Sequence, residues 1–180
     1  KLPNGTIYHI GYVTEGTLKV GDKVDLLVAE DKKLASARNH TATHLLQAAL
    51  KRVVGEHVNQ AGSSVTAEHL RFDFSNFEPV SQEQLEEVEK LVNAEILKAA
   101  DVEIAQMSQE EAKNKGAMAL FGEKYGDVVR VVTVPGFSME LCGGVHVKNA
   151  GQIGMFKILS ESGVASGVRR IEAVTGAAAL

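Results

Sequence analysis

The chain is poor in cysteine: Cys142 is the only one among 180 residues, so an internal disulfide framework is excluded. No signal peptide opens the sequence, and together with the single cysteine this favours a reducing, cytoplasmic compartment. No apolar run approaches the length of a membrane span, so we expect no membrane association. The formal net charge of −4 argues against tight, non-specific nucleic-acid binding by this chain alone. A content of 44% hydrophobic and 23% charged residues is that of a folded globular protein.

Two short motifs, about a hundred residues apart, carry the side chains of a complete metal site. His40 and His44 stand four positions apart in a helical pattern, so both rings project from one face. Cys142 and His146 have the same spacing, and Gly143–Gly144 between them allows the tight turn that lets them converge. Three imidazoles and one thiolate are ligand types that Zn²⁺ prefers. Either pair alone also fits a helix face or a small buried thiol, but together they predict a zinc site.

Local sequence signals predict both helices and strands. Helical spacing and capping boxes predict helices over residues 39–54, from Ser81 to Ile96, and from Ser108 to about Ala119. Alternation and short apolar runs predict strands at residues 7–13, 23–28, 71–74, 128–134, 138–141, 145–147, 155–161 and 168–174, with a short one around Ile104. Asn39 is expected to cap the first helix, after a charged connector over residues 31–38. The predicted class is α+β, with helices packed on a mostly antiparallel sheet and preceded by a partial β-barrel segment.

The N-terminal strands are too few to make a core of their own. We therefore expect residues 1–35 to be the C-terminal remnant of a small β-barrel domain. Residues 36–180 are expected to form the zinc-dependent domain.

Long stretches of sequence surround the two ligand pairs, namely residues 38–46, 136–147 and 151–176, with 57–63 and 70–74 between them. They resemble the two zinc motifs and the intervening segments of the editing domain of alanyl-tRNA synthetases. Threonyl-tRNA synthetases and freestanding alanyl-tRNA editing proteins carry related domains. The stretches around Gln60 and Arg169 favour the alanyl enzyme.

The resemblance implies hydrolysis of an aminoacyl ester, which removes serine or glycine wrongly attached to the 3′ end of the tRNA for alanine. A second site of this kind is useful because an alanine pocket cannot exclude the smaller glycine and rejects an added hydroxyl poorly. The resemblance also implies an ATP-dependent aminoacylation core and a C-terminal dimerisation region, neither of which we find in this sequence. The full-length protein is therefore expected to be a homo-oligomer, with much of its tRNA affinity outside this chain.

The resemblance assigns roles to individual residues. It implies that Zn²⁺ is held by the four predicted ligands, which are His40, His44, Cys142 and His146. Zinc would either activate a water molecule, or only orient the substrate while the terminal ribose hydroxyl of the tRNA assists attack. Four simultaneous ligands would close the tetrahedron, as in structural sites, so the sequence leaves these alternatives open.

Five further residues are candidates for substrate contacts. We hypothesise that Thr41 or Thr43 reads the hydroxyl of serine; the alternative is that both face the helix surface. Gln60 is expected to hydrogen-bond substrate or water, unless it is only a turn residue. Arg169 and Arg170 are candidates for the tRNA acceptor end, and since neighbours in a strand face opposite sides, we expect only one of them to bind it.

One residue departs from the family pattern. Val145 stands where the family usually has threonine, whose hydroxyl could orient water or substrate next to the metal; the alternative is a packing role that valine can fill. Three other functions stay open: a non-catalytic, zinc-stabilised tRNA-binding module, a purely structural zinc domain, and editing of seryl-tRNA for threonine.

Overall fold

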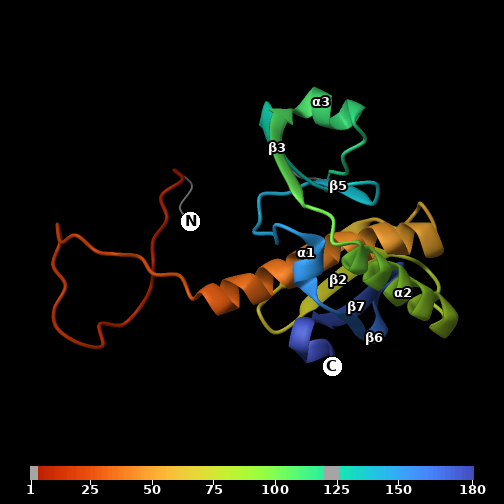
Figure 1. The fold of residues 1–180 in the computed structure, drawn as a ribbon, viewed down its shortest axis with the longest axis horizontal. Helices are drawn as coiled ribbons and strands as arrows, with labels where there is room; N and C mark the ends of the chain where they lie inside the picture. The colour runs from red at the N-terminus through yellow and green to blue at the C-terminus, as the bar shows by residue number, and fades with distance from the viewer. Residues whose placement is uncertain (1–3, 120–125) are drawn as a thin grey trace.

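The computed structural model describes residues 4–119 and 126–180. From Glu30 onward the chain forms a body built around one long helix, α1 (Glu30–Val53), which crosses it from side to side (Figure 1). Residues 4–29 extend away from this body as exposed chain without helix or strand.

The larger sheet has four antiparallel strands in the order β1 (Gln60–Val65), β2 (Leu70–Ser75), β7 (Val168–Thr175) and β6 (Phe156–Ala165). Helix α1 and helix α2 (Gln82–Lys98) pack against each other and against this sheet. Alternation along β2 turns its apolar side chains toward the helices, which places them in the core. Fully buried members of this core are Leu45, Leu46, Leu50, Leu70, Phe72, Phe74, Val88, Val92, Phe156 and Ile171.

A second, smaller sheet lies beside α1 and carries its own cluster of apolar residues. Its strands are β3 (Glu103–Ser108), β4 (Val128–Val134) and β5 (Ser138–Leu141), all antiparallel, with helix α3 (Gln109–Asn114) at one end (Figure 1). Two short 3₁₀ helices, η1 (Ala150–Ile153) and η2 (Gly176–Ala179), complete the described chain.

The turn between β4 and β5 docks on the C-terminal half of α1. Arg52 donates to the carbonyls of Gly136 and Phe137 at 3.3 and 3.1 Å, and its guanidinium lies 3.9 Å from the centroid of the Phe137 ring. This contact fixes the small sheet, and with it the residues that follow β5, relative to the helix.

The predicted α+β class and its antiparallel sheets are confirmed. The capping box of the second helix is also confirmed, because Ser81 Oγ accepts from the Gln84 amide and the Gln84 side chain accepts from the Ser81 amide. The strands expected at 71–74, 128–134, 138–141, 155–161 and 168–174 are all present, as is the short strand around Ile104.

The boundaries of two helices were predicted wrongly. Helix α1 begins at Glu30, so residues 31–38 are helical and the domain boundary proposed at residue 35 falls inside the helix. Asn39 is buried within α1 because tertiary partners take its amide, which donates to the Thr66 carbonyl and accepts from the Thr175 hydroxyl. Helix α3 ends at Asn114, well before residue 119.

Three expected strands are absent from the described residues. Residues 7–13 and 23–28 form none, because no neighbouring strand in the described chain pairs with them. Residues 145–147 form none either: the amide of Val147 donates to the hydroxyl of Thr41 on α1 instead of to a strand partner.

Candidate metal centre

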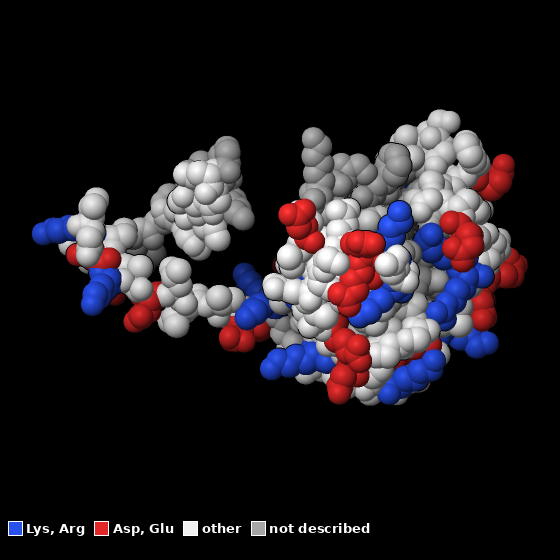
Figure 2. Space-filling model, turned by 90° about the horizontal axis from the view of Figure 1, so that it is seen from above, with Lys and Arg blue, Asp and Glu red and all other residues white. Residues whose placement is uncertain are grey.

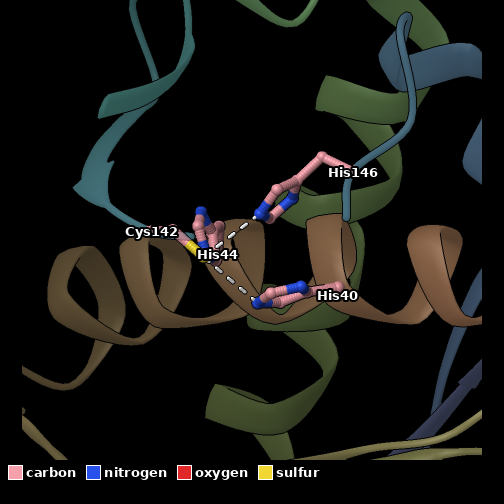
Figure 3. Close-up of side chains that lie close together, drawn as sticks. All are labelled: His40, His44, Cys142 and His146. Carbon is pink, nitrogen blue, oxygen red and sulfur yellow. Dashed lines mark hydrogen bonds between the residues drawn. The ribbon is translucent and has the colours of Figure 1, made fainter. Parts of the chain in front are cut away.

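Helix α1 and the loop after β5 bring the four predicted ligands into one cluster (Figure 3). One ligand atom from each of His40, His44, Cys142 and His146 lies within 4.8 Å of the corresponding atom of every other member. Cys142 Sγ lies 3.4 Å from Nε2 of His40 and 3.3 Å from Nε2 of His146. The structure therefore brings together the four residues that the sequence spacing predicts as metal ligands.

These distances fit one zinc ion. A tetrahedral ion with bonds of about 2.3 Å to sulfur and about 2.0–2.1 Å to nitrogen holds those two atoms about 3.5 Å apart. The observed sulfur–nitrogen distances of 3.4 and 3.3 Å are close to this value. One thiolate and three imidazoles also form a donor set that suits zinc.

Gly144 is required by a close contact with the ring of His40. A Cβ atom built on Gly144 would lie 2.1 Å from Cε1 of His40, far inside van der Waals contact. Any side chain here would displace either the His40 ring or the loop, so the glycine allows the two halves of the site to approach.

Two hydrogen bonds fix the orientation of the histidine rings. Nδ1 of His40 lies 3.2 Å from the Val145 carbonyl, which can only accept, so Nδ1 carries the proton and Nε2 faces Cys142. Nδ1 of His146 lies 3.1 Å from the hydroxyl of Thr41. The Thr41 hydroxyl donates its own hydrogen to the Ala37 carbonyl at 3.0 Å, so it accepts from His146 Nδ1. Nε2 of His146 then carries no proton and can bind a metal.

The third imidazole, that of His44, lies against a buried carboxylate. Nε2 of His44 is 3.6 Å from Oε2 of Glu140, and both side chains are almost completely enclosed. The second oxygen of Glu140, Oε1, has no hydrogen-bond partner among the described residues. A carboxyl group beside a ligating histidine is a common way to orient the ring.

Arg130 on β4 holds the ligand loop in shape. Its Nη1 donates to the carbonyls of Cys142 at 2.7 Å and Gly144 at 2.9 Å, and its own carbonyl accepts from the Cys142 amide at 3.0 Å. The amide of Gly144 in turn points at Cys142 Sγ at 3.4 Å. One guanidinium thus defines the path of the loop between the two ligands it carries.

Burial keeps the histidines neutral, which is the form that binds metal. Burial, with the neighbouring His40 second, lowers the pKa of His44 to about 3. Burial lowers the pKa of His146 to about 2, with His44 and His40 contributing, and it lowers the pKa of His40 as well. Burial raises the pKa of Glu140 to about 8, opposed by Lys51.

The predicted substrate-contact residues occupy different environments in the structure. Thr41 contacts His146 directly, whereas the buried Thr43 donates to the Asn39 carbonyl and keeps its acceptor capacity. Gln60 begins β1 and lines a pocket beside α1. Arg169 and Arg170 make two-pronged ion pairs, with Glu161 at 2.6 and 2.7 Å and with Asp73 at 2.7 and 2.8 Å.

Sequence reasoning missed Arg130 and Glu140 as parts of the site. Each had a visible signal: Arg130 interrupts an apolar strand, and Glu140 lies two residues before Cys142, on a strand that is otherwise largely buried.

On the face of the molecule shown in Figure 2, basic and acidic side chains are interspersed, without a broad area of one charge sign. In the described part of the chain no helix is both long enough and apolar enough to cross a membrane.

Comparison with known proteins finds relatives over nearly the whole chain. It is 58% identical over 176 residues to the alanine–tRNA ligase of Halalkalibacterium halodurans, 58% over 178 residues to that of Clostridioides difficile, and 58% over 179 residues to that of Staphylococcus aureus strain JH9. These alignments cover 98 to 99% of this chain and 20% of each relative, so the chain spans about one fifth of their length. Residues 129–172 match the family described as the threonyl and alanyl tRNA synthetase second additional domain. The resemblance drawn from the sequence motifs is confirmed.

Proposed function

We propose that this chain, which over 98 to 99% of its residues resembles a segment of alanine–tRNA ligases, is a zinc-dependent editing domain. Its reaction is hydrolysis of the ester that joins serine or glycine to the 3′ end of the tRNA for alanine. The observation that carries the proposal is the cluster of His40, His44, Cys142 and His146, whose spacing and donor types suit one zinc ion.

Zinc held by these residues would supply a Lewis acid at the ester, which requires that one ligand give way or that the metal take a fifth ligand. The residues of the chain supply the rest. Thr41 and the Val145 carbonyl hold two imidazoles with Nε2 turned inward, and Glu140 lies against the third.

Thr43 is the better candidate for reading the serine hydroxyl. The hydroxyl of Thr41 already makes three contacts, with Ala37, His146 and Val147, whereas that of Thr43 donates to one carbonyl and can still accept. A buried acceptor that a serine hydroxyl satisfies and an alanine side chain leaves unpaired discriminates against alanine. Correctly charged tRNA would thereby be spared.

Of the two candidate arginines, Arg170 is proposed to meet the acceptor end. Its side chain is 28% exposed, against 17% for Arg169. Its ion pair with Asp73 leaves part of the guanidinium open to a phosphate.

Deacylation of seryl-tRNA for alanine by the whole chain tests the proposal, with Cys142→Ala as the matched inactive variant. Release of serine by the parent and its loss in Cys142→Ala are the expected results. Alanyl-tRNA should stay charged under the same conditions.

Three outcomes would contradict the proposal. Intact tRNA binding without hydrolysis, from a folded and zinc-loaded chain, identifies a binding module. Unfolding of the chain on chelation, without any hydrolysis beforehand, identifies a structural zinc domain. Hydrolysis of seryl-tRNA for threonine in preference to the alanine tRNA identifies a threonyl-type editor, which the matched family also includes.

A further inference from the structure

A stripe of polar side chains runs along α1 where the helix meets the small sheet. His44, Gln47 and Lys51 stand three and four positions apart, so they lie on one face of the helix. Strand β5 of the small sheet is in contact with α1 (Figure 1). Polar groups that are buried between a helix and a sheet need hydrogen-bond partners, so the opposite side of this contact matters.

Strand β5 presents two polar side chains to the same contact. In its register with β4, Ser138 lies opposite Val134 and Glu140 lies opposite Val132, and residues directly opposite each other share a face of the sheet. Those two valines belong to the main core, whereas Leu141 belongs to the separate apolar cluster of the small sheet. Ser138 and Glu140 therefore point toward α1.

Contacts join the two stripes into one polar seam. Nε2 of His44 lies 3.6 Å from Oε2 of Glu140. The backbone of Met118 is bridged to Glu140, and the sulfur of Met118 lies 3.8 Å from Nε2 of Gln47. The polar seam consists of His44, Gln47, Lys51, Ser138 and Glu140.

Three side chains of the polar seam have an unmet hydrogen-bonding group. Oε1 of Gln47, Oγ of Ser138 and Oε1 of Glu140 have no partner within residues 4–119 and 126–180. These residues are only 5 to 6% exposed, so bulk solvent does not reach the three atoms. Turning the Gln47 amide over still leaves one of its two polar atoms without a good partner. Buried polar groups in this state are costly, so three of them together indicate bound molecules that pair with them.

Water is the ligand whose chemistry fits all three groups. An amide, a hydroxyl and a carboxyl group between them donate and accept, and a water molecule does both. The ammonium of Lys51 disfavours a cation in the polar seam, and the carboxyl group of Glu140 disfavours an anion. An apolar ligand would leave all three groups unpaired.

A pocket of about 210 Å³ lies at the end of the polar seam that is farther from His44, between α1 and the turn of the β4–β5 hairpin. Ser138 and Lys51 belong to its lining, as do Arg52 and Phe137. One molecule of liquid water takes up roughly 30 Å³, so the pocket has room for several. The polar seam thus leads from this pocket, past Ser138, to Glu140 and His44.

We propose that a short row of ordered water molecules occupies the polar seam and supplies water from this pocket to the metal cluster. The second half of the inference rests on the proposed function, because hydrolysis consumes one water for each ester. The oxygen of that water bonds to the carbonyl carbon, the bond from this carbon to the ribose oxygen breaks, and the ribose oxygen keeps one of the protons of the water. A supply through the protein can continue while a tRNA covers the outside of the site.

A high-resolution crystal structure of the zinc-loaded whole chain tests the presence of these waters. Ordered waters should lie within hydrogen-bond distance of the Gln47 amide, the Ser138 hydroxyl and Oε1 of Glu140. Oxygen-17 relaxation dispersion counts long-lived internal waters in solution, without a lattice. Ser138→Ala, which cannot overpack the seam, should lose about one such water relative to the parent.

A pair of variants of the same shape tests the supply. Ser138→Val and Ser138→Thr fill the same space, but only threonine keeps the hydroxyl that holds a water. Ser138→Val should lower kcat for seryl-tRNA hydrolysis about tenfold with KM unchanged, and Ser138→Thr should retain most of it. Zinc affinity should stay within about threefold of the parent in both, because Ser138 orients no metal ligand. Ser162→Val, at an exposed position of β6, is the control and should change none of these quantities.

Three results would overturn the inference. The first is a crystal structure in which the polar seam is dry or is filled by the ammonium of Lys51. The second is an unchanged count of long-lived waters in Ser138→Ala. The third is a kcat in Ser138→Val equal to that of the parent, or equally reduced in Ser138→Thr, which would remove the supply. Failure of the proposed function looks different, because the waters would then be present in a parent chain that hydrolyses no ester.

Discussion

At the scale of single residues, one threonine organises half of the candidate metal site. The hydroxyl of Thr41 donates to the Ala37 carbonyl and accepts from His146 Nδ1 and from the Val147 amide. All of its hydrogen-bonding capacity is therefore used to hold the ligand loop on the helix. Val145, by contrast, contributes through its backbone carbonyl, and its side chain is 49% exposed. This favours tolerance of valine at that position.

Thr41→Val should weaken zinc binding about 10- to 100-fold, as is usual when a group that orients a ligand is lost. It should also lower the free energy of unfolding by about 1–3 kcal/mol, because the buried Val147 amide loses its acceptor. Thr43→Val is the matched control, and it should leave zinc affinity within about threefold while reducing the preference for serine esters. Competition with a chromophoric chelator measures the zinc affinity. Equal losses of zinc affinity in both variants would contradict the role given to Thr41.

The buried titratable groups predict the pH dependence of the zinc-free protein. Between pH 8 and 6.5 Glu140 is protonated only in the folded state, since its pKa is raised to about 8, so acidification stabilises the fold. Below pH 6.5 the unfolded chain protonates its histidines, whereas His44 and His146, with pKa values of about 3 and 2, stay neutral when folded. Acidification then destabilises the fold. The melting temperature of the zinc-free chain should therefore be highest near pH 6.5.

Thermal melts of the zinc-free chain from pH 4.5 to 8.5 measure this dependence. Glu140→Gln should remove the rise between pH 8 and 6.5 and leave the fall below pH 6.5. A melting temperature that climbs steadily from pH 6.5 to 8 in the parent would contradict the account.

At the scale of elements, the site joins one helix to one hairpin. Helix α1 carries two of the predicted ligands at helical spacing, and the loop that follows the β4–β5 hairpin carries the other two. Arg52 fixes the hairpin turn to the helix, and Arg130 fixes the loop that follows the hairpin. The loop is therefore held from both sides before any metal binds, which lowers the ordering cost of binding.

Arg130→Met should weaken zinc binding about 10- to 100-fold without unfolding the chain, because the guanidinium contacts loop carbonyls and not the main core. Arg38→Met is a control of the same chemistry at a carbonyl outside the ligand loop, that of Gln152. It should leave zinc affinity unchanged. Zinc titration measures the loss of zinc affinity, and circular dichroism in parallel shows whether the chain is still folded. An unchanged zinc affinity in Arg130→Met would contradict the role given to Arg130 in holding the ligand loop.

The elements that the sequence predicted well are those whose signals are local. The Ser81 capping box and the apolar alternation of 71–74 both appear as expected. Residues 31–38 were not predicted to be helical, because their charge pattern is typical of a solvated connector. In the structure they belong to α1, and residues 31–34 are its exposed part. The predicted ligands could be found from spacing and chemical type. Arg130 is visible as a charge in an apolar strand, but the loop carbonyls that it binds are tertiary contacts that a linear pattern does not show.

At the scale of the whole molecule, residues 4–29 contrast with the rest. They expose many large apolar side chains, among them Ile10, Tyr12 and Leu27, and form no strand. Their alternating sequence still supports the hypothesis that they complete a β-barrel with chain outside this one, as expected for a segment spanning about one fifth of its relatives.

Trypsin should cut first at Lys19 and Lys23 and leave a resistant body that starts close to Glu30. The body should keep its zinc, and its free energy of unfolding should change by no more than about 0.5 kcal/mol, since residues 4–29 bury little against it. Mass spectrometry of timed digests identifies the cuts. Protection of both lysines, or loss of zinc after cleavage, would show that the segment packs on the body.

The most direct test of the account is the rate of seryl-tRNA hydrolysis as a function of bound zinc. The metal-free chain is titrated with zinc, the bound metal is measured by mass spectrometry, and serine release is followed in a single turnover. We expect no hydrolysis without metal, a rate that rises in proportion to zinc occupancy, and saturation at one zinc per chain. Hydrolysis by the metal-free chain at the rate of the loaded chain would contradict it.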